Sequence, residues 1–542
     1  MGRIIVRADW APLLLCILLR AFLSIDCARA AERDYPVRGY FELALEAAAD
    51  AADPYADDLL RITFQRPDGT EVRVDGFYDG GRTYKGRAYC DAAGTWRWRS
   101  QSPDAGLNGK SGRFKVAASD LPGKLRVHPD DGRQFARDNG QWFLHIGDTG
   151  YRYVTQTEPK WREYIDQAGR AGFTKVRTWF CQGRSDVQIL FAAEDRTRLN
   201  LPYWQEIERR LLYALEVHPQ IVFQLIPYGE DTDLLRRYDS GDAGAKLIAR
   251  YAQARFSALP NVTWCISNDR IIVKDGVLKN RDVYGKTIDR IGRDMAGREP
   301  WGTLLTNHQA RFSGYGFVDA PWSDIITIED MDQVDGRVIL EYRRLGGAPI
   351  VNDEDRYEHW RNPAHDRYFF RRLMWASLLS GGFATYGGLR TYEPYDGNVS
   401  GVQGYYDAVD AGKLERGADD FVHIHTFFRE SGLTLIGFEP DDAAVGGDPQ
   451  RFKCIRRGTD CYVVYLANPD GPTPEKADAA KRVPAVTVNL AEGNFEYRWF
   501  DPRSGGWTER KATGGGRQTL TAPAAKDWVL LITGKGFAVL RD

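Results

Sequence analysis

Residues 261–269, with the sequence NVTWCISND, decide the fold of this chain. Bulky and small side chains alternate along the stretch, as Trp264 and Cys265 do, and a period of two is typical of a β-strand. We expect the bulky set to face covering helices and the small set to face the interior of a barrel. Because Asp269 shares the parity of the small set, its side chain is predicted to point into the mouth of that barrel.

Seven further strand-like segments surround this one, at residues 142–148, 173–179, 221–228, 302–308, 324–330, 348–354 and 382–388. Segments with a helical period of 3.6 lie between most of them. Eight alternations of strand and helix over about 290 residues predict a (β/α)8 TIM barrel. The alternative is a doubly wound sheet, which usually has fewer strands and often a glycine-rich fingerprint that is absent here.

The regions on either side of the barrel have β-strand patterns without the alternating helices. Short β runs and turns predict an N-terminal β-sandwich over residues 35–118, the barrel spans 124–415, and strand-like runs predict a C-terminal β-sandwich over 416–542 with no further helices. Residues 1–31 combine basic residues, an apolar core and a small-residue cleavage site, which is typical of a signal peptide. We therefore expect an exported protein, either periplasmic or secreted.

The composition narrows the classes of partner. A net charge of −2 offers no electrostatic case for nucleic acid, and no later stretch reaches the roughly 20 apolar residues of a membrane span. The 15 Trp and 27 Tyr residues suit a protein that stacks on sugar rings. Cys454 and Cys461 flank a turn-like segment, so a hairpin would either pair them in a disulfide or leave both as thiols.

Polar groups end several of the predicted strands. By parity, Asp269, His308, Glu329 and Glu354 should converge at the barrel mouth from four consecutive strands. The first three strands end in Asp148, Trp179 and Tyr228.

The two residues that flank Glu354 have the opposite parity. Asp353 and Asp355 are therefore expected to meet solvent or Arg side chains.

Carboxyl groups on strands four and seven of a barrel lie across its mouth from each other. One protonated and one ionised carboxyl group at such a spacing can hydrolyse a glycosidic bond. This chemistry needs no cofactor, and no metal-binding or phosphate-binding motif occurs, so we expect neither a metal nor a cofactor.

Four segments carry a resemblance to a known family: WFLHIGDTGYRY (142–153), NVTWCISNDR (261–270), LLTNHQA (304–310) and PIVNDEDRYEHW (349–360). Together they resemble the apiosidase-like glycoside hydrolases. The resemblance implies that Asp269 is the acid/base and Glu354 the nucleophile, and that a polysaccharide or oligosaccharide is the substrate, with a furanosyl or related sugar. It also implies a sugar site lined by Asp148, His308, Tyr357 and Glu358.

Asn268 marks a departure from that pattern. The family usually has Gly-Gly-Asp-Arg where this chain has Ser-Asn-Asp-Arg, and an Asn before the acid resembles the larger glycosidase clan, in which it binds a sugar hydroxyl. The competing interpretation is a carbohydrate-binding protein whose catalysis has lapsed. A pure binder has no use for two opposed carboxyl groups, so the Asp269–Glu354 pair separates the two interpretations.

Overall fold

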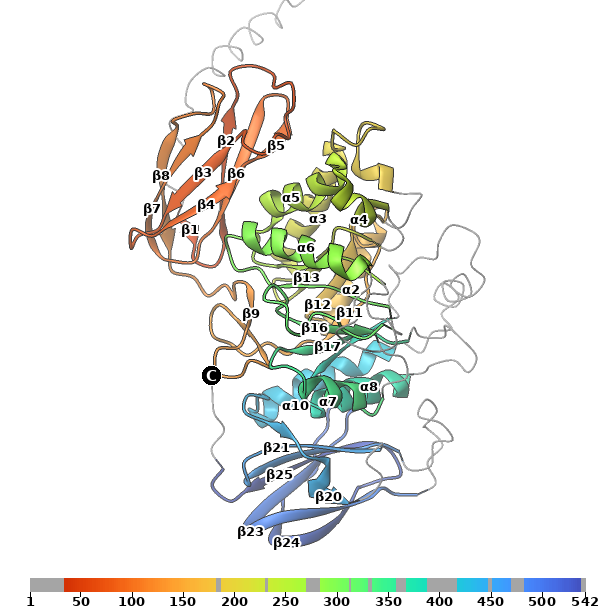
Figure 1. The fold of residues 1–542 in the computed structure, drawn as a ribbon. Helices are drawn as coiled ribbons and strands as arrows, with labels where there is room; N and C mark the ends of the chain where they lie inside the picture. Colours follow the sequence, from red (N-terminus) through yellow and green to blue (C-terminus); the bar gives the residue numbers. More distant parts are fainter. Residues whose placement is uncertain are drawn as a thin grey trace, which may run out of the picture.

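The structure is a computed structural model that describes residues 34–181, 187–229, 233–269, 283–310, 313–329, 334–356, 367–387, 417–446, 451–468 and 482–537. It contains a central barrel, an N-terminal β-domain and a C-terminal β-domain that lie on different sides of the barrel (Figure 1). The predicted signal peptide, Tyr357 and Glu358 fall outside the described residues.

The N-terminal domain is the predicted sandwich of two antiparallel-rich sheets. Alternating burial places residues such as Ile62, Phe64 and Trp96 between them. One sheet has the order β1 (Tyr35–Pro36), β8 (Ser111–Ala117), β7 (Gly94–Gln101), β3 (Arg61–Gln65) and β4 (Glu71–Asp75). The other has the order β2 (Tyr40–Glu46), β6 (Thr83–Tyr89) and β5 (Phe77–Gly80). The short hairpin of β9 (Leu125–Val127) and β10 (Phe135–Arg137) leads from this domain into the barrel.

Eight parallel strands confirm the TIM barrel. In chain order they are β11 (Gly147–Asp148), β12 (Lys175–Trp179), β13 (Val222–Ile226), β14 (Val262–Cys265), β15 (Leu305–Thr306), β16 (Ile326–Glu329), β17 (Ile350–Glu354) and β18 (Phe383–Tyr386). β11 pairs with both β12 and β18, which joins the two ends of the strand series. The seam between β15 and β16 is bridged by Asp324, whose backbone N–H donates to Leu305 O at 2.9 Å and whose Oδ2 accepts from Leu305 N at 2.8 Å.

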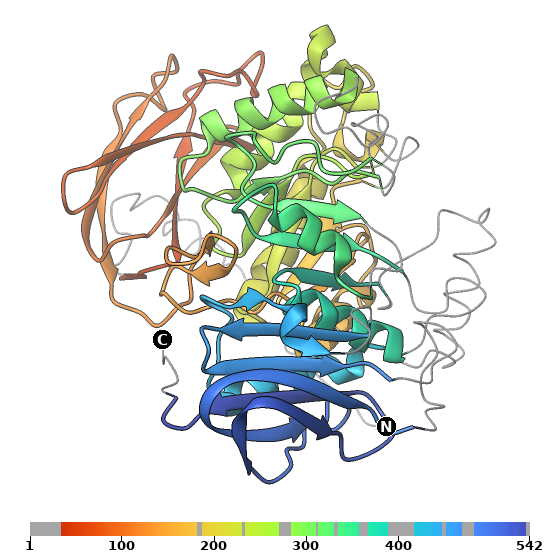
Figure 2. The same ribbon diagram turned by 60° about the horizontal axis from the view of Figure 1, so that its bottom comes forward.

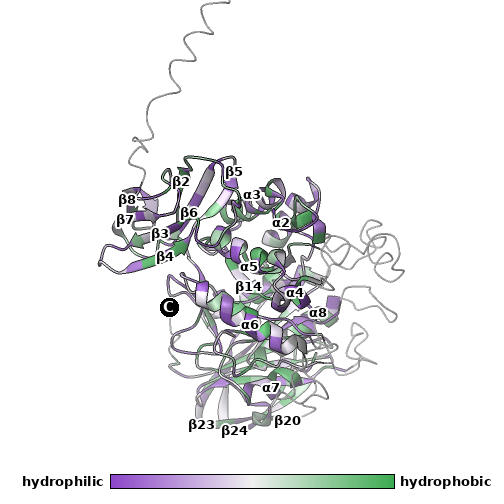
Figure 3. Ribbon diagram, turned by 45° about the horizontal axis from the view of Figure 1, so that its top comes forward, coloured by the Kyte–Doolittle hydropathy of each residue, from purple (hydrophilic) through white to green (hydrophobic). Residues whose placement is uncertain are grey.

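Amphipathic helices cover the barrel. They are α2 (Lys160–Arg170), α3 (Leu201–Val217), α4 (Asp233–Arg237), α5 (Ala243–Phe256), α6 (Val283–Arg298), α7 (Arg337–Arg343), α8 (Arg367–Leu379) and α10 (Phe421–Ser431). The described residues also form the short 3-10 turns η1 (Val187–Leu190), η2 (Tyr238–Ser240) and η3 (Gly417–Asp420), and η4 (Asp442–Ala444), which packs on the C-terminal sheet. Along α6, hydrophilic and hydrophobic residues follow one another as in a helix with one buried face (Figure 3). No described helix has the length and apolar character needed to cross a membrane.

The expectation that helices stop after residue 415 was wrong, because η3 and α10 follow. Phe421, Ile424 and Phe427 recur at helical spacing and are buried against the barrel core, so this segment supplies the helix after the eighth strand. The barrel therefore continues past the predicted boundary.

The C-terminal domain is one connected sheet rather than two separate sheets. Its strands are β19 (Glu439–Pro440), β20 (Val445–Gly446), β21 (Phe452–Arg457), β22 (Cys461–Leu466), β23 (Ala485–Phe500), β24 (Lys511–Thr521) and β25 (Trp528–Gly534). The long β23 pairs with β20 and β24 in its first half and with β25 and β24 in its second. A bulge between Leu490 and Asn494 interrupts its ladder, and bulges bend a strand.

Cys454 and Cys461 are thiols. The hairpin register pairs Cys454 with Val464 and Cys461 with Arg457. The two cysteines are therefore offset by three positions along the ladder, so their side chains lie on opposite faces of the sheet and pack in different cores.

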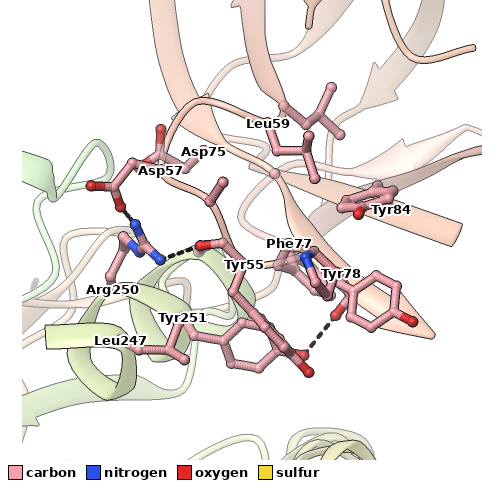
Figure 4. A pocket seen from close by; sticks show the side chains of 15 residues that line it. Tyr55, Asp57, Leu59, Asp75, Phe77, Tyr78, Tyr84, Leu247, Arg250 and Tyr251 are labelled. Carbon is pink, nitrogen blue, oxygen red and sulfur yellow. Dashed lines mark hydrogen bonds and ion pairs between the residues drawn. The ribbon is translucent and has the colours of Figure 1, made fainter. Parts of the chain in front are cut away.

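Buried ion pairs join the domains. On the N-terminal side, Arg87 of β6 and Arg255 of α5 both bind Glu208 of α3, at 2.7 and 2.6 Å. A small cavity lies beside α5 and is lined by Tyr55, Tyr251 and neighbouring residues (Figure 4). The C-terminal sheet lies against the barrel on another side (Figure 2).

The ion pair on the C-terminal side is bidentate. Arg371 of α8 donates two hydrogen bonds of 2.8 Å to the carboxylate of Asp527. Both side chains are buried, so the pair ties the sheet firmly to the barrel.

Candidate active site

Three strand ends bring Asp269, His308 and Glu354 together at the barrel mouth. His308 Nδ1 lies 2.9 Å from Asp269 Oδ1, and His308 Nε2 lies 3.9 Å from Glu354 Oε2. One ligand atom from each of the three residues lies within 4.8 Å of the others. The residues follow β14, follow β15 and end β17, so they come from distant parts of the chain.

Asp269 is held in an unusual backbone conformation. Its φ of 47° lies in the left-handed region, which residues other than Gly seldom adopt. Such strain gathers at functional sites, where the surrounding structure maintains it. Its side chain is 23% exposed, whereas the His308 side chain is fully buried. Asp269 is therefore the member of the cluster that solvent reaches most easily.

Glu354 lies in a cationic, hydrogen-bonding environment. The guanidinium of Arg177 lies 3.3 Å from Glu354 Oε2, and the Tyr151 hydroxyl donates a hydrogen bond to the same oxygen. Arg177 is fully buried on β12. One oxygen of Glu354 thus has both a buried cation and a hydroxyl donor against it.

Asn268 is fixed by the same two residues. Arg177 Nη2 donates to Asn268 Oδ1 at 2.6 Å, and the Tyr151 hydroxyl lies 3.2 Å from that oxygen. Asn268 Nδ2 is buried and has no hydrogen-bond partner within the part of the chain that the structure describes. The two contacts to Oδ1 therefore orient the amide, and its Nδ2 can donate a hydrogen bond to a ligand.

Trp179 forms one wall of the group. Its ring stacks on Tyr151 with centroids 4.3 Å apart and an interplanar angle of 7°. Tyr151 and Arg177 are residues that sequence reasoning missed. Arg177 shares the parity of Trp179 on its strand, so its inward direction could have been predicted from the sequence. Tyr151 lies in a loop, where no periodic pattern predicts the direction of a side chain.

Asp353 meets an Arg side chain, one of the two outcomes predicted for it, because Arg177 Nε lies 3.6 Å from its Oδ2; it does not meet solvent. Its side chain lies inside the barrel, where Oδ1 binds the ammonium of Lys175 and accepts a hydrogen bond of 2.6 Å from Thr385. The register between β16 and β17 shifts, so that Glu329 pairs with Glu354 and Asp353 becomes the extra residue of a bulge. A bulge breaks the alternation of side chains on which the parity argument rested.

Burial alone would raise the pKa of Asp353, but the charges of Lys175 and Arg177 hold it well below its usual range. Asp355 is also buried, and its Oδ2 accepts a hydrogen bond of 3.0 Å from Asn352. Asp355 therefore does not face solvent, and the alternative that it meets an Arg side chain stays a prediction.

Two of the predicted sugar ligands are engaged elsewhere. The carboxylate of Asp148 accepts a hydrogen bond from Tyr164 of α2, and burial raises its pKa to about 7. The Tyr228 hydroxyl donates to Ala245 O of α5 at 2.6 Å. Both side chains are thus directed at covering helices rather than brought against the carboxyl pair. Glu329 is buried beside Glu354 on the adjacent strand.

The donor set of Asp269, His308 and Glu354 also resembles a divalent metal site. Arg177 argues against that use, because its buried positive charge lies 3.3 Å from the Glu354 oxygen that would bind the ion.

The family comparison agrees with the fold. A model described as the apiosidase-like catalytic domain matches residues 129–433, and a domain of unknown function, DUF5060, matches residues 36–103. The first match extends through α10, in line with the barrel seen here. No curated protein matches this chain.

Solved structures show the same fold. A provisionally assigned glycoside hydrolase from Bacteroides vulgatus has a TM-score of 0.71 and 20% identity, and the match covers 93% of this chain and all of that one. A glycoside hydrolase of family 5 from the same species has a TM-score of 0.60 and 17% identity, covering 77% and 95%.

Proposed function

We propose that this chain, which belongs to the apiosidase-like family of glycoside hydrolases, cleaves its glycosidic bond with the carboxyl groups of Asp269 and Glu354. The observation that carries the proposal is their approach at the barrel mouth, with one oxygen of each within 4.8 Å of the other. Two such groups with different surroundings are what acid catalysis and nucleophilic attack require together.

The surroundings assign the roles. Arg177 and the Tyr151 hydroxyl both favour a negative charge on Glu354, which suits a nucleophile. Asp269 is partly exposed and lies beside His308, which suits a group that exchanges protons with the leaving oxygen and with water.

The reaction then has two steps. Glu354 attacks the anomeric carbon while Asp269 donates its proton to the leaving oxygen, which breaks the glycosidic bond and leaves a glycosyl ester on Glu354. Asp269, now ionised, takes a proton from water as that water attacks the anomeric carbon and releases Glu354. Asn268 Nδ2, which is oriented and unpaired within the described structure, is suited to hold a sugar hydroxyl through both steps.

The spacing favours retention of the anomeric configuration. Retaining enzymes keep their carboxyl groups about 5 Å apart, whereas inverting enzymes need roughly 6.5 to 9.5 Å to fit a water molecule between them. The short approach of Asp269 and Glu354 leaves no such room.

The proposal extends to the substrate and to the location of the protein. The family resemblance supports a furanosyl or related sugar in a plant or microbial polysaccharide as the unit released. The signal-like residues 1–31 support export to the periplasm or the medium, where such polymers are found.

The test is sugar release from a panel of pectic, arabinose-containing and galactose-containing glycans. We expect the wild type to release one sugar and Glu354→Gln, still folded, to be slower by about 10³-fold or more. The exposed Glu341 of α7 supplies a matched control, Glu341→Gln, which should keep full activity. NMR of the first-formed product should show the anomer of the substrate.

If the wild type releases no sugar from any glycan of the panel but binds one of them, the protein is better explained as a carbohydrate-binding protein whose catalysis has lapsed. A metal-dependent activity that chelators abolish and Zn²⁺ restores would instead favour the metal interpretation of the same three residues.

A further inference from the structure

The outward face of the five-stranded sheet in the N-terminal domain carries an excess of positive charge. Its outward positions on β3, β4, β7 and β8 include six basic and two acidic residues, although the whole chain has a net charge of −2. The basic residues are Arg61, Arg73, Arg97, Arg99, Arg113 and Lys115, all exposed. Three of them form ion pairs: Arg61 with Asp58 and Asp75, Arg99 with Glu71, and Lys115 with Asp34 just outside the strands. We call this surface the arginine face.

Two of these arginines face each other directly. The register of β7 and β8 pairs Arg97 with Arg113, and like charges opposite each other across strands destabilise a sheet. Neither side chain has a hydrogen bond or an ion pair with any residue that the structure describes. A purely structural face would gain from an acidic residue at either position, so the pair points to an external anion.

The face is also hollowed. A shallow groove of about 390 Å³ runs over β3, β7 and β8, lined by both arginines of the facing pair. Thr63, Gln65 and Ser111 add hydroxyl and amide groups along it, and Trp98 lies against Gly112 at its side. Polar groups of this kind bind sugar hydroxyls, whereas a binder of simple anions has no need of them.

We propose that the arginine face binds a carboxylated polysaccharide, one that repeats uronate groups along its length. Arg99 already shows the mode of binding, because its two terminal nitrogens hold the carboxylate of Glu71 at 2.7 and 2.9 Å. The planar fork of Arg matches a carboxylate in this bidentate way, which explains why five of the six cations are Arg. Cations repeat about 7 Å along a strand and about 5 Å between strands, an array suited to a polymer.

The position of the face defines its role. The three-stranded sheet of the same domain packs against α5, through contacts such as Arg87 to Arg255 O, so the arginine face is turned away from the barrel. Binding there would hold the enzyme on an acidic polymer without feeding that chain into the mouth. The inference is therefore independent of the catalytic roles of Asp269 and Glu354.

The test is binding of the full chain to polygalacturonate, measured by affinity electrophoresis and calorimetry. We expect R97Q/R113Q to bind about tenfold more weakly than the wild type or worse, and wild-type binding to be lost at about 1 M salt. The control R293Q/R337Q removes two exposed arginines of α6 and α7, and should bind as the wild type does. Polygalacturonate with its carboxyl groups reduced to alcohols should not bind.

The melting temperature of R97Q/R113Q shows whether a loss of binding comes from unfolding. Because R97Q/R113Q removes a like-charge contact, its melting temperature should equal or exceed that of the wild type. Equal binding by the two double variants, or retention of the reduced polymer, would overturn the proposal. So would binding of sulfated dextran or DNA by a chain that does not bind polygalacturonate.

Discussion

Asp353 and Glu354 are neighbours in sequence but belong to two different regions of the barrel. Asp353 lies in the interior, where Lys175 and Thr385 bind its carboxylate and solvent is excluded. Glu354 lies at the mouth, where Arg177 and Tyr151 bind one oxygen and His308 stands 3.9 Å away. The Asp353 carboxylate is thus enclosed by the fold, whereas the Glu354 carboxylate lies at the strand end beside Asp269 and His308.

Arg177 connects the two regions. Its Nε lies 3.6 Å from Asp353 Oδ2, and its Nη1 lies 3.3 Å from Glu354 Oε2. The comparison teaches that burial by itself does not mark a catalytic carboxylate. What distinguishes Glu354 is its place at the strand end, where its carboxylate lies within 4.8 Å of ligand atoms of Asp269 and His308.

The largest effect should come from breaking the interior pair. Lys175→Met removes the nearer of the two cations beside buried Asp353 and leaves Arg177 Nε 3.6 Å away, so we expect a cost of up to about 3–5 kcal/mol of stability. We expect this loss in urea unfolding, whereas Glu354→Gln should stay within about 1 kcal/mol of the wild type. The double variant K175M/D353N should recover much of the loss, because no charge is then left unpaired. Equal destabilisation by Lys175→Met and Glu354→Gln would remove the distinction between the two regions.

Asp148 extends the comparison to a third carboxyl group. It is buried like Asp353, but it forms no ion pair with a cation among the described residues. Burial raises its pKa to about 7, so the folded state holds a proton that the unfolded state releases near pH 4. This group's contribution to stability is therefore fully present below about pH 4 and is lost as the pH rises through about 7.

We expect Asp148→Asn to flatten the pH dependence of the unfolding free energy. The difference between wild type and variant should change by at most about 3 kcal/mol between pH 5 and pH 8, in favour of the variant at pH 8. Chemical denaturation at several pH values measures it. Parallel curves for the two proteins would show that Asp148 is ionised throughout.

The smallest expected effect is on catalysis, from a change at the barrel mouth. Tyr151→Phe removes one hydrogen bond to the Glu354 carboxylate and keeps the stack on Trp179. We expect kcat/KM to fall about tenfold, or about 1.4 kcal/mol, because the Glu354 carboxylate loses one hydrogen-bond donor. Tyr213→Phe is a matched control on α3, and an equal loss of activity there would argue for a general packing effect.

Much of this architecture was predictable because its signals are local. Alternation of side chains along residues 261–269 and its seven counterparts indicated the strands, helical periodicity indicated the covering helices, and the family match confirms the resemblance read from four motifs. The convergence of Asp269, His308 and Glu354 followed from the rule that parallel strands present their carboxyl ends on one side. Their catalytic roles remain a prediction.

The departures arise where pairing between distant segments overrides local pattern. Parity placed Asp353 outside, but the register shift between β16 and β17 turned it inward. The hairpin register likewise separated Cys454 from Cys461.

The sequence by itself determined the barrel, the flanking β-domains and the approach of the polar strand ends, because side-chain periodicity is a property of each segment alone. Only the tertiary structure decided which carboxylate receives Lys175 and which receives Tyr151, and that Asp148 and Tyr228 bond to helices. Those choices depend on register, bulges and the reach of side chains from other strands, which no single segment encodes.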